Sequence, residues 1–141
     1  MSTLYSTKVT AIGGRSGTVR SDDGFLDLPL ALPVTMGGKG GATNPEQLFA
    51  AGYAACFETA VIYVARNTAT KVSDTDIVVV AGVGLQPNGS GGFGLSVALD
   101  VAITGLDQAT AEEIVKVAHA TCPYSNAVKG NIDVAITITT N

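Results

Sequence analysis

A chain of 141 residues with 12 acidic and 8 basic side chains has a net charge of −4, which argues against nucleic acid or an anionic membrane surface as its partner. Only 14% of the residues are charged and 46% are hydrophobic, so little polar material is left to cover a surface, and part of that surface is expected to be hidden in an oligomer. The length fits one domain, 1–141, with a core that needs no disulfide or metal to hold it.

The N-terminal segment MSTLYSTKVTAIGGR has no apolar h-region, so no secretory signal is expected. The apolar run LFAAGYAACF is flanked by Glu46 and Glu58 and is far shorter than the ~20 residues of a membrane span. These features predict a cytoplasmic protein without a membrane partner, in which Cys56 and Cys122 are not expected to form a purely structural disulfide. Two cysteines and one histidine are too few, and wrongly spaced, for a zinc site, so no metal is expected.

The first part of the chain has the pattern of a small antiparallel meander over residues 4–32. The segments TKVTAI and GTVRS read as strands around a turn at Gly13-Gly14, and DDG at 22–24 turns the chain into FLDLPLAL. The next segment, MGGKGGATNP, is rich in glycine but lacks the spacing of a phosphate-binding loop. A flexible connector is therefore expected there.

A long helix is predicted from Pro45 to about Asn67. Asn44 is a good N-cap, Pro45 suits the first helical position, and Gln47 stands at the third, close to a capping box. Apolar residues occur all the way round this helix, so we expect it to be buried on every side. They are Leu48, Phe49, Tyr53, Phe57, Val61, Ile62 and Val64.

The rest of the chain predicts two strands, two helices and a last strand. Residues 76–85 and 93–103 read as strands around the turn QPNGSGG. TAEEIVKVAHA predicts an amphipathic helix with Thr110 and Glu113 as a capping box, and CPYSNAVKG a short helix that stops at Gly130. NIDVAITIT closes the chain as a strand with one apolar face, made of Ile132, Val134, Ile136 and Ile138. This order favours an α+β fold with largely antiparallel sheets.

Cys56 lies in the apolar middle of the long helix, where a cysteine is usually a small core residue. Three features favour a reactive thiol instead. Cys122 is a second cysteine and is followed by proline, Arg15 lies in the glycine-flanked turn GGRSG, and Glu46 at the helix start could hold an arginine. Because burial disfavours a thiolate and the helix dipole fades after the first turn, a reactive Cys56 needs a cation.

Lys39, Lys129 and Arg15 are the candidates for this cation. Arg15 is preferred, because a guanidinium stays charged when desolvated and its planar fork can bridge two acceptors. Glu46 can then pair with Arg15, although a carboxylate at a helix start also simply matches the dipole. Glu46 and Cys56 are about 15 Å apart along a straight helix, too far to share one arginine within a chain. A dimer in which Glu46 comes from the other subunit is therefore our hypothesis.

The segments GGRSG, GGKGGATNPEQLFAAGYAACF and CPYSNAVKGNI together resemble the organic hydroperoxide resistance proteins, within the larger superfamily of osmotically inducible protein C. The resemblance runs in order over nearly the full chain, and CPYSNA favours the hydroperoxide-resistance branch over the osmotically induced one. It implies that family's fold, with antiparallel sheets packed around a long buried central helix. It also implies an intertwined homodimer with two active sites at the subunit interface.

The resemblance assigns roles to four residues. Cys56 matches the family's peroxidatic cysteine, Cys122 its resolving cysteine, Arg15 its active-site arginine and Glu46 the carboxylate partner that orients the arginine. The implied activity is that of a thiol peroxidase that reduces organic hydroperoxides through a sulfenic acid and an intramolecular disulfide. The implied reductant is a dithiol, dihydrolipoamide or a lipoylated protein, and no bound cofactor is expected.

An apolar pocket near the thiols would suit alkyl or fatty-acid hydroperoxides better than hydrogen peroxide. The residues that could line it are Met36, Phe49, Tyr53, Phe57, Phe93 and Tyr124. His119 precedes Cys122 on the second helix and could act as an acid or base, although a lone histidine there is more often structural. Two other functions stay open, a peroxide-responsive redox sensor that does not turn over and a non-catalytic carrier of apolar ligands.

Overall fold

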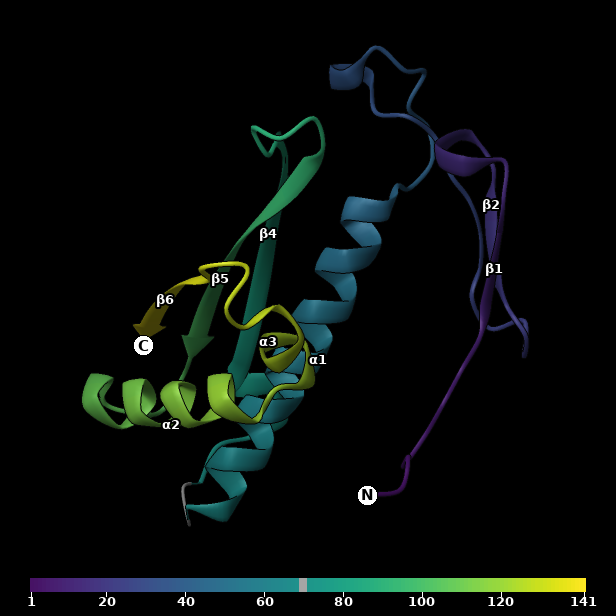
Figure 1. Cartoon of the computed structure of the whole chain (residues 1–141). Helices are drawn as coiled ribbons and strands as arrows, with labels where there is room; N and C mark the ends of the chain where they lie inside the picture. Colours follow the sequence, from purple (N-terminus) through teal and green to yellow (C-terminus); the bar gives the residue numbers. More distant parts are fainter. Residues whose placement is uncertain (69–70) are drawn as a thin grey trace. The chain divides into compact units, whose positions relative to one another are not determined.

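The computed structural model describes residues 1–68 and 71–141, which fall into two compact units, Met1–Leu48 and Phe49–Asn141. Within the described residues the elements are two three-stranded sheets, three α-helices and short 3₁₀ turns, so the predicted α+β class is confirmed (Figure 1). The expectation that these units form one domain stays a prediction from chain length.

The unit Met1–Leu48 contains the predicted meander. Strands β1 (Val9–Ile12), β2 (Thr18–Ser21) and β3 (Asp27–Pro29) are antiparallel and lie in the order β1-β2-β3. The turn between β1 and β2 is the 3₁₀ turn η1 (Gly14–Ser16), which Gly13 enters with φ 85°. A Cβ at Gly17 would collide with the carbonyl oxygen of Ile12, so only glycine lets the chain close this tightly. The GGRSG turn is thereby fixed in shape, with Arg15 in its centre.

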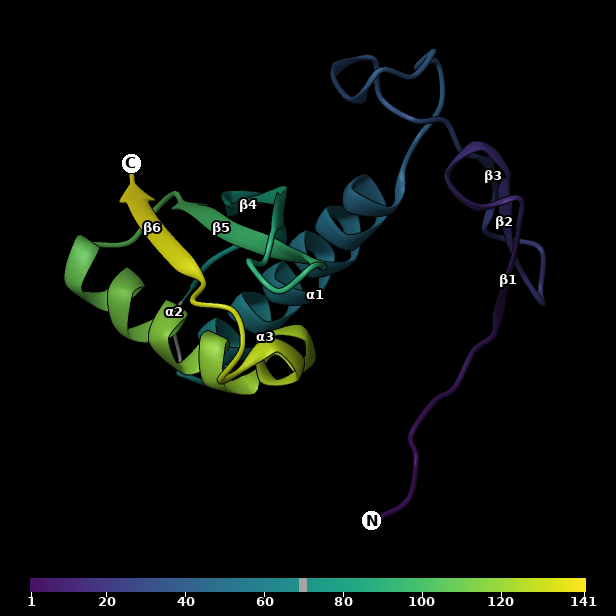
Figure 2. The same ribbon diagram turned by 45° about the horizontal axis from the view of Figure 1, so that its top comes forward.

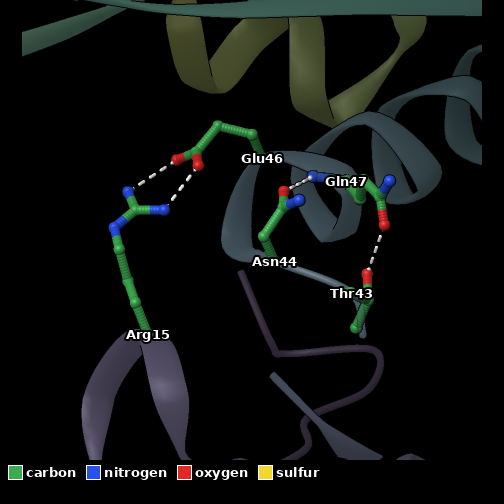
Figure 3. A network of polar contacts seen from close by, with 5 residues as sticks. All are labelled: Arg15, Thr43, Asn44, Glu46 and Gln47. Carbon is green, nitrogen blue, oxygen red and sulfur yellow. Dashed lines mark hydrogen bonds and ion pairs between the residues drawn. The ribbon is translucent and has the colours of Figure 1, made fainter. Parts of the chain in front are cut away.

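A second 3₁₀ turn, η2 (Val34–Met36), and the glycine-rich loop lead to α1 (Pro45–Asn67), as predicted. The Asn44 side chain accepts a hydrogen bond from the backbone N–H of Gln47 at 2.9 Å, which confirms the N-cap (Figure 3). The Gln47 side chain accepts instead from the Thr43 hydroxyl at 2.7 Å. The Asn44 side chain therefore caps the helix, but the reciprocal half of a capping box is missing, because the Gln47 side chain bonds to Thr43 instead.

Helix α1 is not buried on every side within the chain, and that expectation is wrong. One face is buried and carries Tyr53, Phe57, Ala60, Val61, Val64 and Ala65. A stripe of exposed positions runs along the other side at helical spacing, through Ala51, Ala55, Thr59 and Tyr63. An all-round apolar sequence indicates that a helix has apolar surroundings but not whether its own chain provides them.

The unit Phe49–Asn141 contains the second sheet, made of β4 (Ile77–Pro87), β5 (Phe93–Ile103) and β6 (Ala135–Thr140). Strands β4 and β5 form an antiparallel hairpin, and β6 pairs parallel to β5. The parallel pair follows from the two helices between β5 and β6, which carry the chain back before it rejoins the sheet. The sheets are largely antiparallel, as predicted, with this one exception.

The connection consists of α2 (Gln108–Thr121) and α3 (Pro123–Val128). The predicted capping box of Thr110 and Glu113 is wrong, because the N-cap is Asp107, whose carboxylate accepts from the Thr110 N–H and hydroxyl. Helix α3 ends just before Gly130, which has φ 79°. The final strand begins later than predicted, at Ala135, so Ile132 and Val134 pack against the core ahead of it.

The core of this unit lies between one face of the sheet and the helices α1 and α2, which both lie on that side (Figures 1 and 2). Inward residues of β5 alternate with exposed ones, which explains the period-2 pattern in the sequence. The buried members on β5 are Val97, Leu99, Val101 and Ile103. The opposite face leaves Val78 and Val80 of β4 exposed.

By length and composition, α1 is the one helix in residues 1–68 and 71–141 apolar enough to cross a membrane. The core helix of a water-soluble protein passes the same test, and six residues of α1 are buried in the protein. The core position accounts for the apolar residues on its buried face.

Candidate active site

Arg15 and Glu46 form a two-pronged ion pair inside the unit Met1–Leu48. The guanidinium donates from Nη1 to Oε1 at 2.6 Å and from Nη2 to Oε2 at 2.9 Å, with the two side chains facing each other (Figure 3). This fork-to-fork geometry fixes the arginine more firmly than a single contact would. Hydrogen bonding to Arg15 lowers the pKa of Glu46, and hydrogen bonding to Glu46 raises the pKa of Arg15. Both groups are therefore held in their charged forms.

The pairing of Arg15 with Glu46 was expected, but its location was not. The pair forms within one chain, so Glu46 needs no second subunit to reach Arg15, whereas the subunit whose Cys56 the pair serves stays a hypothesis. The physical reason is local, because the GGRSG turn and the first turn of α1 belong to the same compact unit. Arg15 and Glu46 therefore form one ion pair in which the carboxylate holds the guanidinium in place.

The two thiols are brought together in the unit Phe49–Asn141. Cys56 is in the middle of α1 and partly exposed, whereas Cys122 is the N-cap of α3 and fully buried. The Cys122 thiol donates to the Cys56 sulfur with 3.7 Å between the sulfurs. Both cysteines are in the thiol form. A small side-chain movement would bring the sulfurs to the ~2.05 Å of a disulfide.

Burial raises the pKa of the Cys56 thiol above its ordinary value. The backbone N–H of Tyr124 opposes this shift by hydrogen bonding to the sulfur, and the neighbouring Cys122 thiol adds to it. Within residues 71–141 and 49–68, none of the groups that shift this pKa is a cation. The surroundings of Cys56 within this unit therefore favour the neutral thiol.

The aromatic residues predicted to line a pocket are found in three settings. Phe49 and Tyr124, whose rings meet edge to face at 6.3 Å, line an apolar cavity of about 300 Å³ with Pro123, Ala127 and Val128. Tyr53 and Phe57 have no exposed surface and belong to the core rather than to a pocket mouth. Met36 is half-exposed in the unit Met1–Leu48, and Phe93 is exposed where β5 begins.

Two residues near the thiols escaped the sequence interpretation. A Cβ at Gly52 would collide with the Tyr124 hydroxyl, so this glycine lets the Tyr124 ring lie against α1 one turn before Cys56. Ser125 is buried and hydrogen-bonded to Tyr53 at 2.6 Å and to His119 at 2.8 Å. The signals were the spacings, since Gly52 lies four residues before Cys56 and Ser125 three after Cys122.

The remaining cation candidates lie elsewhere. Lys129 lines a second cavity, of about 400 Å³, together with Lys116, His119 and Asp133. Lys39 is in the glycine-rich loop after η2. In residues 1–68 and 71–141, no group of three or more histidine, cysteine, aspartate or glutamate side chains is placed to hold a metal ion.

Comparison with known proteins places these features in a family. Residues 38–137 match the family model described as OsmC-like protein. The chain is 48% identical over 137 residues to the organic hydroperoxide resistance protein of Xanthomonas axonopodis pv. citri, a match covering 96% of this chain and 94% of that protein.

Solved structures agree with that match. The organic hydroperoxide resistance protein of Legionella pneumophila has a TM-score of 0.93 and 50% identity, and the match covers 98% of this chain and 99% of that one. The corresponding protein of Elizabethkingia anophelis has a TM-score of 0.94 and 43% identity over the full length of both chains. The resemblance inferred from the three sequence segments is confirmed.

Proposed function

Because this chain belongs to the OsmC-like family, among its organic hydroperoxide resistance proteins, we propose that it reduces organic hydroperoxides to alcohols with its own thiols. The observation that carries this proposal is the 3.7 Å distance between the Cys56 and Cys122 sulfurs. Two thiols at this distance, one partly exposed and one buried, suit a nucleophile and a resolving thiol.

In the proposed cycle the Cys56 thiolate attacks the distal oxygen of the hydroperoxide. The O–O bond breaks, the alkoxide takes a proton and leaves as an alcohol, and Cys56 becomes a sulfenic acid. Cys122 then attacks the Cys56 sulfur, the S–O bond breaks, and water leaves as the disulfide forms. The short distance between the sulfurs supports this step, which also protects Cys56 from further oxidation.

Arg15 supplies the positive charge in this proposal. It would stabilise the Cys56 thiolate and the departing alkoxide, with Glu46 holding the guanidinium in place. Glu46 is in the first turn of α1, and Cys56 lies ~15 Å further along the same helix. Because the two are too far apart to share one arginine within a chain, we infer that the pair serves the thiol of a second copy of the chain. We therefore propose a homodimer in which the Arg15–Glu46 pair of one subunit completes the thiol site of the other.

The apolar cavity beside Tyr124 favours alkyl and fatty-acid hydroperoxides over hydrogen peroxide. Tyr124 links this cavity to the chemistry, because its backbone N–H is hydrogen-bonded to the Cys56 sulfur. Dihydrolipoamide or a lipoylated protein is the proposed reductant, since a dithiol reopens a disulfide by exchange without a bound cofactor. The proposed location is the cytoplasm, where such dithiols are kept reduced.

The deciding experiment compares tert-butyl, fatty-acid and hydrogen peroxides, each with dihydrolipoamide and with thioredoxin as electron donor. The proposal expects turnover with the organic peroxides that Cys56→Ser abolishes. It expects Cys122→Ser to reduce one equivalent of peroxide and then stop. Oxidation without steady-state turnover would instead identify a redox sensor, and ligand binding that survives Cys56→Ser without any peroxide consumption would identify a carrier.

A further inference from the structure

Two pairs of side chains bridge α1 and α3 one helical turn apart. Cys56 of α1 meets Cys122 at the start of α3, and Tyr53 of α1 meets Ser125 of α3 with 2.6 Å between the hydroxyl oxygens. Each cysteine is three residues from the hydroxyl on its own segment, the spacing that places side chains on one helix face. A layer of hydroxyls therefore lies directly beside the layer of thiols.

The side chains that join the hydroxyl layer to the buried thiol are shielded from solvent. Tyr53 is 0% exposed, Cys122 is 0% exposed and Ser125 is 3% exposed. Burial raises the pKa of the Tyr53 phenol, the hydrogen bond to Ser125 lowers it, and the charges of Cys122 and Cys56 raise it further. The Cys122 thiol donates to the Cys56 sulfur and has no exposed surface, so its proton has no direct contact with solvent in this chain.

The other end of the hydroxyl layer reaches an open cavity. Ser125 is hydrogen-bonded to Nδ1 of His119 at 2.8 Å, and His119 lines the cavity of about 400 Å³. The ring of His119 packs against Phe57 of α1. The charged groups that face it across this cavity are Lys116 of α2, Lys129 after α3 and Asp133 before β6. Tyr53, Ser125 and His119 thus form a hydrogen-bonded chain that runs from the side chain one turn before Cys56 to the open cavity.

Ser125 has a single proton, so it can donate to only one of its two neighbours at a time. In one arrangement Tyr53 donates to Ser125 and Ser125 donates to a neutral His119. In the other, a protonated His119 donates to Ser125 and Ser125 donates to Tyr53, which frees the phenol proton for the thiol layer. Passing one proton along the path converts the first arrangement into the second, with every hydrogen bond kept.

We propose that Tyr53, Ser125 and His119 form a proton relay that serves the disulfide-forming step. The inference rests on the proposed peroxidase cycle. Tyr53 takes the proton of the Cys122 thiol while its own proton passes to Ser125 and that of Ser125 to His119. The Cys122 thiolate then forms the S–S bond and breaks the S–O bond of the Cys56 sulfenic acid. The leaving hydroxide recovers one proton, released by His119 through the relay or to the solvent, and departs as water.

The test separates the two chemical steps in the full-length protein by rapid quenching after mixing with one equivalent of tert-butyl hydroperoxide. A sulfenic-acid trap measures the first step, and loss of free thiols by mass spectrometry measures the second. For Tyr53→Phe, Ser125→Ala and His119→Ala we expect sulfenic acid to form within about twofold of the wild-type rate. Disulfide formation should slow by about 10- to 100-fold, the range of a lost proton-transfer group.

Rescue by imidazole distinguishes a relay from a packing role. Because His119 faces a cavity open to solvent, added imidazole should accelerate disulfide formation in His119→Ala but not in Tyr53→Phe, where the path is broken at a residue that has no exposed surface and does not line the cavity. Lys116→Gln, on the rim of the same cavity but outside the path, is the matched control and should behave as wild type. Unchanged disulfide formation in Ser125→Ala, or a slow His119→Ala that imidazole does not accelerate, overturns the relay. A wild-type protein that forms no sulfenic acid refutes the peroxidase cycle itself.

Discussion

Burial and the Cys122 thiol oppose ionisation of Cys56 and only the Tyr124 N–H favours it, so the charge of Arg15 is expected to decide its reactivity. In Arg15→Ala the thiol pKa should lie above the ordinary value of about 8.5, since burial raises it. The rate of sulfenic acid formation at pH 7 should then fall at least about tenfold, as the thiolate fraction does. It should recover as the pH is raised toward 9 and above. Stopped-flow peroxide consumption across this range measures the effect.

Arg20 provides the matched control for this prediction. It belongs to the same unit, and its ion pair with Asp27 is exposed and long, at 3.8 Å. Arg20→Ala should leave the rate and its pH dependence unchanged. Equal losses in the two variants would mean that net charge, rather than the placed guanidinium, governs the thiol.

Glu46 links the ion pair to stability at low pH. Its pKa is lowered in the folded protein, so its contribution is present above the unfolded value near 4.5 and is lost as the pH falls through the lower folded value. Because Arg15 is partly exposed, Glu46→Gln should reduce the free energy of unfolding at pH 7 by about 1 kcal/mol or less. The two proteins should converge at acid pH, below that lowered value. Urea denaturation at both pH values tests this, and a difference that persists at low pH would contradict it.

At the scale of elements, the contact of α1 with α3 depends on the absence of a side chain at Gly52. In Gly52→Ala the new methyl group would collide with the Tyr124 phenol and turn its ring toward the apolar cavity. We expect KM for a fatty-acid hydroperoxide to rise about three- to tenfold with little change for tert-butyl hydroperoxide. Gly82→Ala in β4, where a Cβ meets only the Ala98 carbonyl oxygen at 3.8 Å, is the control. Equal KM changes for both substrates would exclude a steric role of this contact.

The start of α2 offers a test of helix capping. Asp107 accepts hydrogen bonds from the N–H and the hydroxyl of Thr110, so Asp107→Ala should lower Tm by about 2 to 4 °C. Glu113→Ala should leave Tm nearly unchanged, because Glu113 takes no part in the cap. Thermal unfolding followed by circular dichroism gives both values, and the opposite order would restore the capping box first predicted.

Mixing two inactive variants tests whether the Arg15–Glu46 pair of one subunit serves the thiols of the other. In a mixed dimer of Cys56→Ser and Arg15→Ala, one site would combine an intact pair from the first subunit with an intact Cys56 from the second. Activity should therefore return to about half of the wild-type value if the pair serves the partner's thiol. No recovery in dimers proven to be mixed would place both groups in one chain.

The sequence predicted the elements well because their signals are local. The period-2 pattern of β5 and the Asn44 cap of α1 each depend on neighbouring residues, and both were identified correctly. The exposed stripe of α1 was missed, because an apolar residue such as Tyr63 gives no sign of whether its own chain covers it. Charge and shape made the pairing of Arg15 with Glu46 one of two open interpretations and the family resemblance favoured it, whereas its location within one chain could not be predicted.

The Tyr53–Ser125–His119 path could not be predicted because it joins three elements. Tyr53 and Ser125 are separated by 72 positions, and neither is unusual in its own segment. Only the folded arrangement of α1, α2 and α3 brings their polar atoms into contact. The two thiols could be identified from the sequence because cysteine itself is reactive. A path of hydrogen bonds between ordinary residues could not be identified in this way.

The unequal exposure of the two sulfurs has a consequence for regeneration. In the proposed cycle an incoming dithiol would attack the disulfide at the partly exposed Cys56 rather than at the buried Cys122, so Cys122 would be the leaving group. The first covalent link to the electron donor would then be made at the residue that met the peroxide. Oxidant and reductant would use one entrance in turn, and a bulky peroxide in excess would slow its own turnover by occupying it.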